Sequence, residues 1–208
     1  MLTKSRLKYV FRRYDFTPLK RLGENYLIDG NIKDKIIREC RFSKTDSVLE
    51  IGPGLGALTI DLAKTGARVF AVEIDKKAYA ILNELAGCGH PNLEIFNEDI
   101  LKFDLKKIAS GGKIKVVGNL PYYITTPIIE YLINNRHLLE SVVIMVQREV
   151  ANRLLAGPGT KDRSSISCFV QYFTRPEYIY TVKRTSFFPS PDVDSSILRL
   201  TVPDKPSV

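Results

Sequence analysis

The order of elements that the sequence predicts indicates an α/β fold built on a mostly parallel sheet. Segments with the apolar spacing of a helix alternate with short apolar runs that are typical of buried strands. Strands that alternate with helices normally lie parallel in one sheet, with helices on both of its faces. Several predicted strands also end in glycine, asparagine or a carboxylate, at the edge where such folds bind ligands.

Five apolar runs of strand length occupy the first three quarters of the chain. We predict strands at Ser47–Ile51, Arg68–Ile74, Leu93–Asn97, Ile114–Val117 and Val142–Val146. We predict helices at Ile32–Cys40, Leu55–Lys64, Lys76–Leu85, Pro127–Ile133 and Arg148–Leu155. The proline that opens the fourth helix suits a first turn, where its missing N–H costs nothing.

The alternation stops beyond residue 163. Ile166–Phe173, Tyr178–Val182 and Ser196–Val202 have strand composition, with little helix between them. We therefore expect an antiparallel hairpin at one edge of the sheet.

The composition is ordinary for a globular protein and shows no membrane span. Of the 208 residues 44% are hydrophobic and 26% charged, and no apolar run approaches the ~20 residues that cross a bilayer. The N-terminus lacks the apolar region of a secretory signal. Cys40, Cys88 and Cys168 are widely spaced, so we expect small buried residues in a reducing, cytoplasmic setting, with no disulfide framework and no metal site.

Positive charge is concentrated at the N-terminus of a chain whose net charge is +8. Within residues 1–23 the only acidic residue is Asp15. The basic residues there are Lys4, Arg6, Lys8, Arg12, Arg13, Lys20 and Arg21, with Tyr9, Phe11, Tyr14 and Phe16 between them. A basic arm with aromatic residues fits a polyanion such as RNA, and a solvated extension fits the composition equally well.

Three predicted strands end in residues that could form a nucleoside pocket together. The first strand runs into Glu50-Ile-Gly-Pro-Gly-Leu-Gly56, where glycines permit a tight turn and a close approach of ligand to main chain. The second strand ends at Glu73 and Ile74, and a carboxylate there can accept from both hydroxyls of a ribose. Asp99 follows the third strand and could accept a hydrogen bond from an adenine amino group.

Two cofactors fit this outline. Gly52, Gly54 and Ala57 satisfy the relaxed dinucleotide fingerprint, and Glu73 follows about 20 residues later, so a nicotinamide enzyme is a real alternative. Glu50 beside the loop favours a cationic ligand over a pyrophosphate. S-adenosylmethionine, which carries a sulfonium and an ammonium but no phosphate, fits better.

The fourth strand leads into the segment Asn119-Leu-Pro-Tyr122. The side-chain oxygen of Asn119 and the carbonyl of Leu120 can accept hydrogen bonds from an exocyclic amino group, and the Tyr122 ring can stack on the base that carries it. Alone, the segment would fit an ordinary strand end with a turn at Pro121. The pocket predicted upstream makes chemistry on a nucleobase nitrogen the better interpretation.

Seven segments follow one another in an order that is known from one enzyme family. They are Gly23-Glu-Asn25-Tyr-Leu27-Ile-Asp29, Glu50–Gly56, Glu73, Asp99, Asn119–Tyr122, Gln147-Arg-Glu149-Val-Ala151-x-Arg153-Leu and Phe187-x-Pro189-x-Pro191-x-Val193-x-Ser195. In this order they resemble the motifs of the rRNA adenine N6-dimethyltransferases of the KsgA/Erm group, over roughly residues 19 to 202. Tyr123–Ile128 and Pro158–Asp162 resemble the KsgA branch more than the Erm branch.

The resemblance implies a Rossmann-like S-adenosylmethionine-dependent methyltransferase fold, with a mostly parallel seven-stranded sheet and an antiparallel edge hairpin. It implies an enzyme that dimethylates the N6 atoms of two adjacent adenosines near the 3′ end of small-subunit rRNA. The partner would be the immature small ribosomal subunit, and methylation would be coupled to ribosome assembly. We expect a monomeric cytoplasmic enzyme that does not bind membranes.

The same resemblance assigns the site residues. The cofactor would be bound by Asn25, Leu27, Glu50, Gly52, Gly54, Gly56, Glu73, Ile74, Asp99, Ile100 and Asn119. The reacting base would be held by Asn119, Leu120, Pro121, Tyr122 and Phe187. Tyr122 and Phe187 would sandwich the base, and Phe188 would belong to the core.

The expected domain organisation is a basic arm at residues 1–23 and a catalytic domain at residues 24–205. The small helical C-terminal domain of the family is expected to be absent from this chain. Glu24 and Tyr26 stand where the family usually has Gln and Phe. Two alternatives remain: an Erm-like methyltransferase that acts on large-subunit rRNA and confers macrolide resistance, and an RNA-binding assembly factor with little catalysis.

Overall fold

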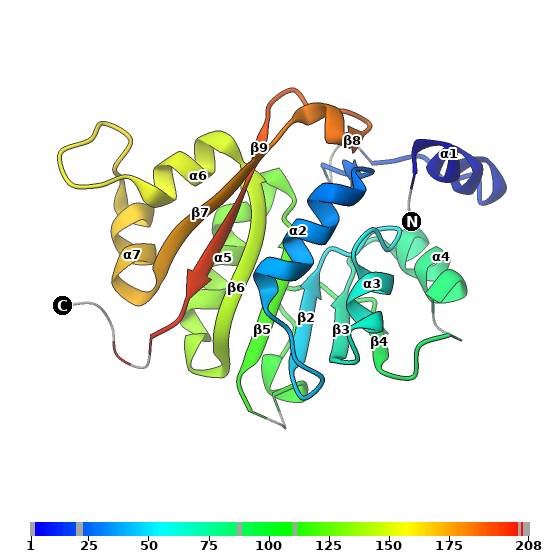
Figure 1. Ribbon diagram of the computed structural model, residues 1–208, viewed down its shortest axis with the longest axis horizontal. Coiled ribbons are helices and arrows are strands. Elements are labelled where there is room, and N and C mark those ends of the chain that lie inside the picture. The colour runs from blue at the N-terminus through cyan, green and yellow to red at the C-terminus, as the bar shows by residue number, and fades with distance from the viewer. Residues whose placement is uncertain (1–2, 20–22, 87–88, 110–111, 204, 206–208) are drawn as a thin grey trace.

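A seven-stranded sheet of order β4-β3-β2-β5-β6-β9-β7 forms the centre of the computed structural model, which describes residues 3–19, 23–86, 89–109, 112–203 and 205 (Figure 1). The strands are β2 (Ser47–Ile51), β3 (Arg68–Val72), β4 (Leu93–Phe96), β5 (Ile114–Asn119), β6 (Leu139–Gln147), β7 (Arg175–Val182) and β9 (Ser195–Thr201). All neighbours from β4 to β6 are parallel, and β9 is antiparallel to both β6 and β7. The predicted mostly parallel sheet with an antiparallel edge is confirmed.

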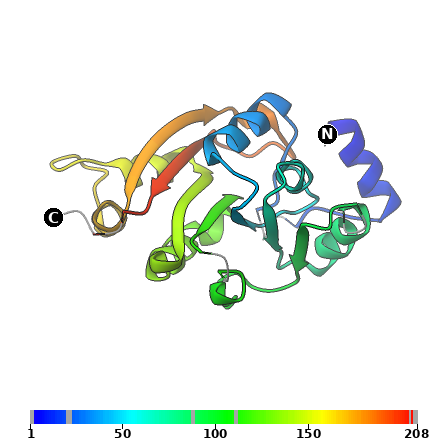
Figure 2. The same ribbon diagram turned by 60° about the horizontal axis from the view of Figure 1, so that its bottom comes forward.

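Helices cover both faces of the sheet (Figure 2). They are α2 (Gly30–Cys40), α3 (Thr59–Lys64), α4 (Lys76–Ala86), α5 (Thr125–Asn134), α6 (Arg148–Leu155) and α7 (Ser165–Phe173). The first helix, α1 (Lys4–Arg13), packs instead beside α4 and the glycine loop. Successive strand residues point to opposite faces, so Val116 packs in the cluster with α5, α6 and α7, whereas Val117 packs in the cluster with α2 and α3. Burial on both faces explains why the parallel strands are apolar runs without alternation.

One predicted helix begins later than expected. The segment Leu55–Lys64 starts as turns, and α3 begins only at Thr59. Gly54 and Gly56 have φ angles of 55° and 83°, in the left-handed region, so the backbone cannot be helical through this loop. The glycines that favour a ligand loop therefore also shorten the helix.

The strand predicted at Ile166–Phe173 is wrong, because this segment is the helix α7. Its β-branched and aromatic residues favour a strand locally. Ser164 and Ser167 form a capping box at its start, and Ser167, Val170 and Thr174 are buried at helical spacing. Packing of this face against α6 and the sheet overrides the local preference.

A second sheet, which we did not predict, joins distant parts of the chain. Its strands are β1 (Tyr26–Leu27) and β8 (Phe187–Phe188), which pair antiparallel. Two-residue strands carry no sequence period, so only the tertiary fold reveals them. This pairing places the first and last family motifs next to each other.

Much of the predicted N-terminal arm is a docked helix. Leu7, Val10 and Phe16 are buried, and they pack against residues of the cofactor loop and of α4. Lys20 and Arg21 lie outside the residues that the structure describes.

The cysteines differ from one another. Cys40 is buried as expected, Cys168 is exposed on α7, and Cys88 lies outside the described residues. Helix α7 turns only part of its surface to the core, which leaves Cys168 on the solvent side. None of the described helices combines the length and apolar character that crossing a membrane requires.

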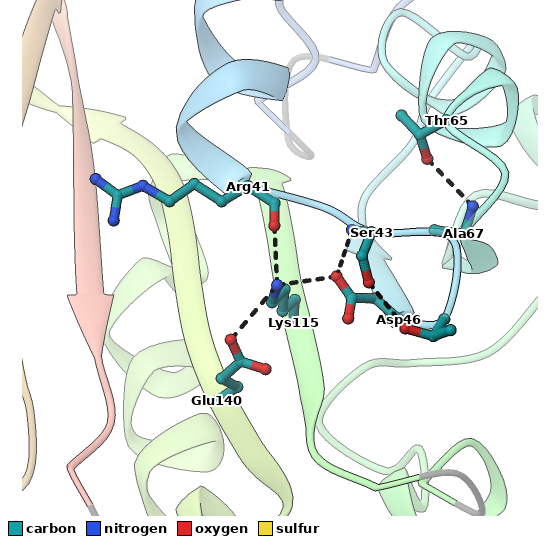
Figure 3. Close-up of polar contacts among 8 residues, drawn as sticks. Arg41, Ser43, Asp46, Thr65, Ala67, Lys115 and Glu140 are labelled. Atoms are coloured by element: carbon teal, nitrogen blue, oxygen red, sulfur yellow. Dashed lines mark hydrogen bonds and ion pairs between the residues drawn. The ribbon is translucent and has the colours of Figure 1, made fainter.

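Lys115 connects three segments at the amino ends of the central strands (Figure 3). Its Nζ donates to the Arg41 carbonyl and to Asp46 Oδ2, each at 2.9 Å, and lies 3.4 Å from Glu140 Oε1. The Ser43 N–H donates to the same Asp46 oxygen at 2.7 Å. Burial raises the pKa of the Asp46 carboxyl, but these hydrogen bonds bring it below its ordinary 3.8. The loop after α2 is thereby fixed to β5 and β6.

Replacing Lys115 with Met should reduce the free energy of unfolding by about 1–3 kcal/mol, because Asp46 would be left half-buried without its cation. Since the folded-state pKa of Asp46 is lowered, this contribution exists above pH 3.8 and is lost as the pH falls through the folded value. Urea unfolding near neutral pH and at acid pH measures both effects. Lys44→Met, in the same loop but exposed, is the control; an equal effect there would contradict the interpretation.

Candidate active site

An open pocket with an empty volume of about 920 Å³ lies at the carboxyl ends of β2, β3 and β5. The register explains its position, because Ile51 is level with both Val72 and Gly118. The residues that follow these three positions therefore meet at one point. The predicted site residues that line the pocket are Asn25, Leu27, Glu50, Gly52, Gly54, Glu73, Ile74, Asp99, Ile100, Asn119 and Pro121.

The glycine loop is attached to the end of β3 through Glu73. One oxygen of this carboxylate accepts from the Gly54 N–H and the other from the Asp75 N–H, each at 2.9 Å. A Cβ at Gly54 would lie 2.9 Å from the Tyr26 ring, so a larger residue would push the loop off this position. Glu73 is thus held in one orientation and is 6% exposed, at the place predicted for a ribose acceptor.

Two further carboxyl groups make the pocket acidic. Burial raises the pKa of the Glu50 carboxyl to about 8. Burial, with Asp75 and Glu73 nearby, raises that of Glu24 to about 7. Among the described residues, Glu50 Oε2 has no hydrogen-bond partner. A buried acid with an unpartnered oxygen fits a positively charged ligand, which would supply the missing interaction.

Asn119 is oriented by the first family motif. Its Nδ2 donates to the Asn25 carbonyl at 3.0 Å, and no described residue donates to its side-chain oxygen. The Leu120 side chain is buried and its N–H donates to the Met145 carbonyl at 3.0 Å, so the backbone here is rigid. An acceptor oxygen is therefore held at the end of β5, beside the pocket.

The ring of Tyr122 is fixed just outside the pocket lining. Its hydroxyl and the Ser195 hydroxyl are 2.9 Å apart, and burial raises its pKa. Thr125 Oγ1 donates to the Pro121 carbonyl at 2.9 Å and ties the turn to α5. The next residue, Tyr123, lines the pocket with half of its surface exposed.

Two expected site residues, Phe187 and Gly56, do not line the pocket. Phe187 is 2% exposed in the core beside Leu27, and it does not line the pocket. It pairs with Leu27 in the small sheet, and its expected role opposite Tyr122 on a bound base stays a prediction. A Cβ at Gly56 would lie 2.6 Å from Leu82, which indicates a glycine required by packing against α4.

Several residues that line the pocket were not expected from the sequence. They are Gly23, Glu24, Tyr26, Ile51, Pro53, Ala57, Leu58, Val72, Glu98, Tyr123, Ile124 and Ile128. Glu24 and Tyr26 lie inside a recognised motif, so their position could have been inferred. Tyr123 and Ile124 directly follow the tetrapeptide, and only the short turn after β5 brings them back to the pocket.

The fold and the acidic pocket beside a glycine loop define an S-adenosylmethionine-dependent methyltransferase. A family model described as ribosomal RNA adenine dimethylase matches residues 16–208. The chain therefore belongs to this family, which confirms the resemblance, the enzyme class and S-adenosylmethionine as the cofactor in place of a nicotinamide.

Relatives with known names support this assignment. The chain is 44% identical to ribosomal RNA small subunit methyltransferase A of Alkaliphilus oremlandii, over 97% of this chain and 71% of the relative. Identity to the enzyme of that name from Geobacillus kaustophilus is also 44%, over 99% of this chain and 72% of the relative. In structure, the chain is similar to a dimethyladenosine transferase from Plasmodium falciparum, with a TM-score of 0.78 and 33% sequence identity. The match covers 86% of this chain and 64% of the transferase. It is also similar to the 23S rRNA methyltransferase ErmE, with a TM-score of 0.76 and 31% sequence identity. This match covers 88% of this chain and 72% of ErmE.

Proton release on cofactor binding tests the acidic pocket. With pKa values of about 8 and about 7, Glu50 and Glu24 are substantially protonated near neutral pH. A bound cation favours their ionised forms, so binding should release protons, and affinity should rise as the pH increases toward about 8. Calorimetry in buffers of different ionisation enthalpy counts the protons, and Glu50→Gln should lower the count. S-adenosylhomocysteine, which has no sulfonium, should release fewer; pH-independent affinity would contradict the assignment.

Glu73→Ala should weaken S-adenosylmethionine binding by about a hundredfold, roughly 3 kcal/mol, because it removes a charged acceptor and also frees the Gly54 loop. Equilibrium binding of the cofactor measures this loss. Glu94→Ala removes the same charge from an exposed position on β4 and should leave the affinity unchanged. Full affinity in the Glu73 variant would refute its role as a ribose ligand.

Proposed function

We propose that this chain dimethylates the N6 atoms of adenosines in small-subunit rRNA, at two adjacent positions near the 3′ end of the RNA. The observation that carries the proposal is the oriented Asn119 carboxamide, whose oxygen remains available beside an acidic cofactor pocket. The small-subunit substrate is supported by the names of the relatives at 44% identity.

The protein acts on the adenine amino group by positioning it. The N6 lone pair is delocalised into the ring, so the nitrogen is a poor nucleophile. Acceptance of its hydrogens by the Asn119 side-chain oxygen and the Leu120 carbonyl would favour a tetrahedral nitrogen with a localised lone pair. The cofactor supplies an electrophilic methyl group on a sulfonium. The methylated ammonium product loses its proton readily, so no strong general base is required.

Aromatic rings around the tetrapeptide would hold the base after it leaves its stack. Tyr122 supplies one rigid ring, because its hydroxyl is fixed by Ser195. Phe187 could supply the second face only by leaving the core, whereas Tyr123 offers an exposed ring at the pocket without rearrangement. Stacking contributes about 1–3 kcal/mol per base, which offsets much of the unstacking cost.

The test of the substrate uses both ribosomal subunits. Incubation with radiolabelled S-adenosylmethionine and unmodified subunits should label the small subunit, and digestion should yield N6,N6-dimethyladenosine. Label in the large subunit would support the Erm-like alternative. Cofactor binding without label in either subunit would support an assembly factor that turns over poorly.

Asn119→Ala should reduce methyl transfer at least about a hundredfold, because the nitrogen is no longer positioned. Affinity for S-adenosylmethionine should stay within about tenfold, roughly 1.4 kcal/mol, since this side chain does not hold a cofactor charge. Asn135→Ala, at the end of α5 away from the pocket lining, is the control. If cofactor binding collapsed together with transfer, Asn119 would be chiefly a cofactor ligand.

A further inference from the structure

The exposed side of α1 carries cations one helical turn apart. Lys4, Lys8 and Arg12 are all exposed, and α1 contains no acidic residue. Neither Lys8 nor Arg12 forms an ion pair with a residue that the structure describes. These three residues form a basic stripe along the helix, in which the Lys4 ammonium also lies 5.3 Å from the centre of the Phe188 ring.

Part of this stripe works against the stability of the helix that carries it, although Arg12 in the last turn suits the negative end of the helix dipole. Like charges four residues apart repel one another. Lys4 and Arg6 in the first turn also face the positive end of the helix dipole. Surface charges that oppose helix stability are explained more readily by a polyanionic partner than by solvation.

The side of α1 next to the stripe packs against the cofactor pocket, and Lys4 at the edge of the stripe lies over the Phe188 ring. The Phe11 ring lies 5.9 Å from the Tyr26 ring, edge-on, and is stacked on Phe188 at 6.1 Å. Tyr26 lines the pocket and contacts Gly54 of the glycine loop. A direct chain of contacts therefore runs from α1 to the cofactor loop.

Polar contacts anchor the end of α1 on α4. The Tyr14 hydroxyl donates to Glu84 at 2.7 Å, Arg13 lies 3.7 Å from the same carboxylate, and Lys77 donates to the Asp15 carbonyl. In Figure 1, α1 and β8 lie toward the edge to which the parallel strands point. The basic stripe is thus on the same side of the molecule as the pocket.

We propose that the stripe of Lys4, Lys8 and Arg12 binds the phosphate backbone of the substrate RNA, and that the Phe11–Tyr26 contact couples this binding to cofactor affinity. The inference rests on the proposed function for the identity of the RNA. A membrane surface fits less well, because the apolar side of α1 is already buried against the protein. RNA held on α1 would stabilise the docked helix and, through Tyr26, the glycine loop.

Charge reversal tests the RNA surface. In the double variant Lys8→Glu and Arg12→Glu, affinity for a fluorescent single-stranded RNA that contains adenosine should fall about tenfold or more at low salt. A plot of the logarithm of the binding constant against the logarithm of the salt concentration should become shallower by about 0.7 for each lost phosphate contact. Arg41→Glu with Lys44→Glu makes the same charge change in the loop after α2, at the opposite edge of the sheet. That control should bind RNA within about twofold of the unsubstituted chain.

Cofactor affinity with and without RNA tests the coupling. Saturating RNA should increase the affinity of the unsubstituted chain for S-adenosylmethionine by about fivefold or more. Phe11→Ala keeps the basic stripe but removes the ring contact to Tyr26, so RNA should still bind while the increase disappears. Phe169→Ala, which removes a ring on α7, should retain the increase.

The outcomes separate this inference from the proposed function. Equal RNA affinity in the two doubly substituted chains would overturn the RNA surface, and a retained increase in Phe11→Ala would overturn the coupling. Binding to phosphatidylserine vesicles but not to RNA would assign the stripe to a membrane. If small subunits are methylated while the α1 variants behave like the unsubstituted chain, only this inference fails. If the unsubstituted chain neither binds the cofactor nor methylates, the proposed function fails.

Discussion

The two hydrogen bonds to the Glu73 carboxylate organise the whole cofactor end of this structure. They fix Gly54 in its left-handed conformation and hold the glycine loop against the end of β3. With the loop in place, the Tyr26 ring packs against Gly54, and the aromatic cluster on which α1 docks can form around it. Loss of this carboxylate would therefore affect the predicted ribose acceptor, the loop and the N-terminal helix together.

The pocket is acidic at a cost to the stability of the empty protein. Burial raises the pKa values of Glu24, Glu50 and Glu73, so the folded state favours their protonated forms. For Glu50, the associated stability is complete below pH 4.5 and is lost as the pH rises through about 8. A cationic cofactor reverses this penalty, whereas its product without the sulfonium does so less. If the proposed site holds the cofactor, binding strength and discrimination against the product would have one electrostatic origin.

The catalytic end is assembled from segments that are far apart in the sequence. Asn25 orients the Asn119 amide, and Ser195 fixes the Tyr122 hydroxyl. The β1–β8 pairing holds the segment after Asn25 beside Phe187–Phe188, and Ser195 is held in β9. Because each group is held by another rigid element, the acceptor oxygens are positioned before any substrate binds, as positioning catalysis requires.

The sequence by itself determined the parallel sheet, its strand ends and about half of the pocket lining. Buried parallel strands are apolar runs that can be recognised locally, and the residues after Ile51, Val72 and Gly118 must meet because their strands are in register. Only the tertiary structure decided that Ile166–Phe173 is a helix, since packing against α6 and the sheet overrides a strand-like composition. It also decided that α1 is docked and that Phe187 faces the core, because both depend on contacts between residues distant in the chain, which no local pattern records.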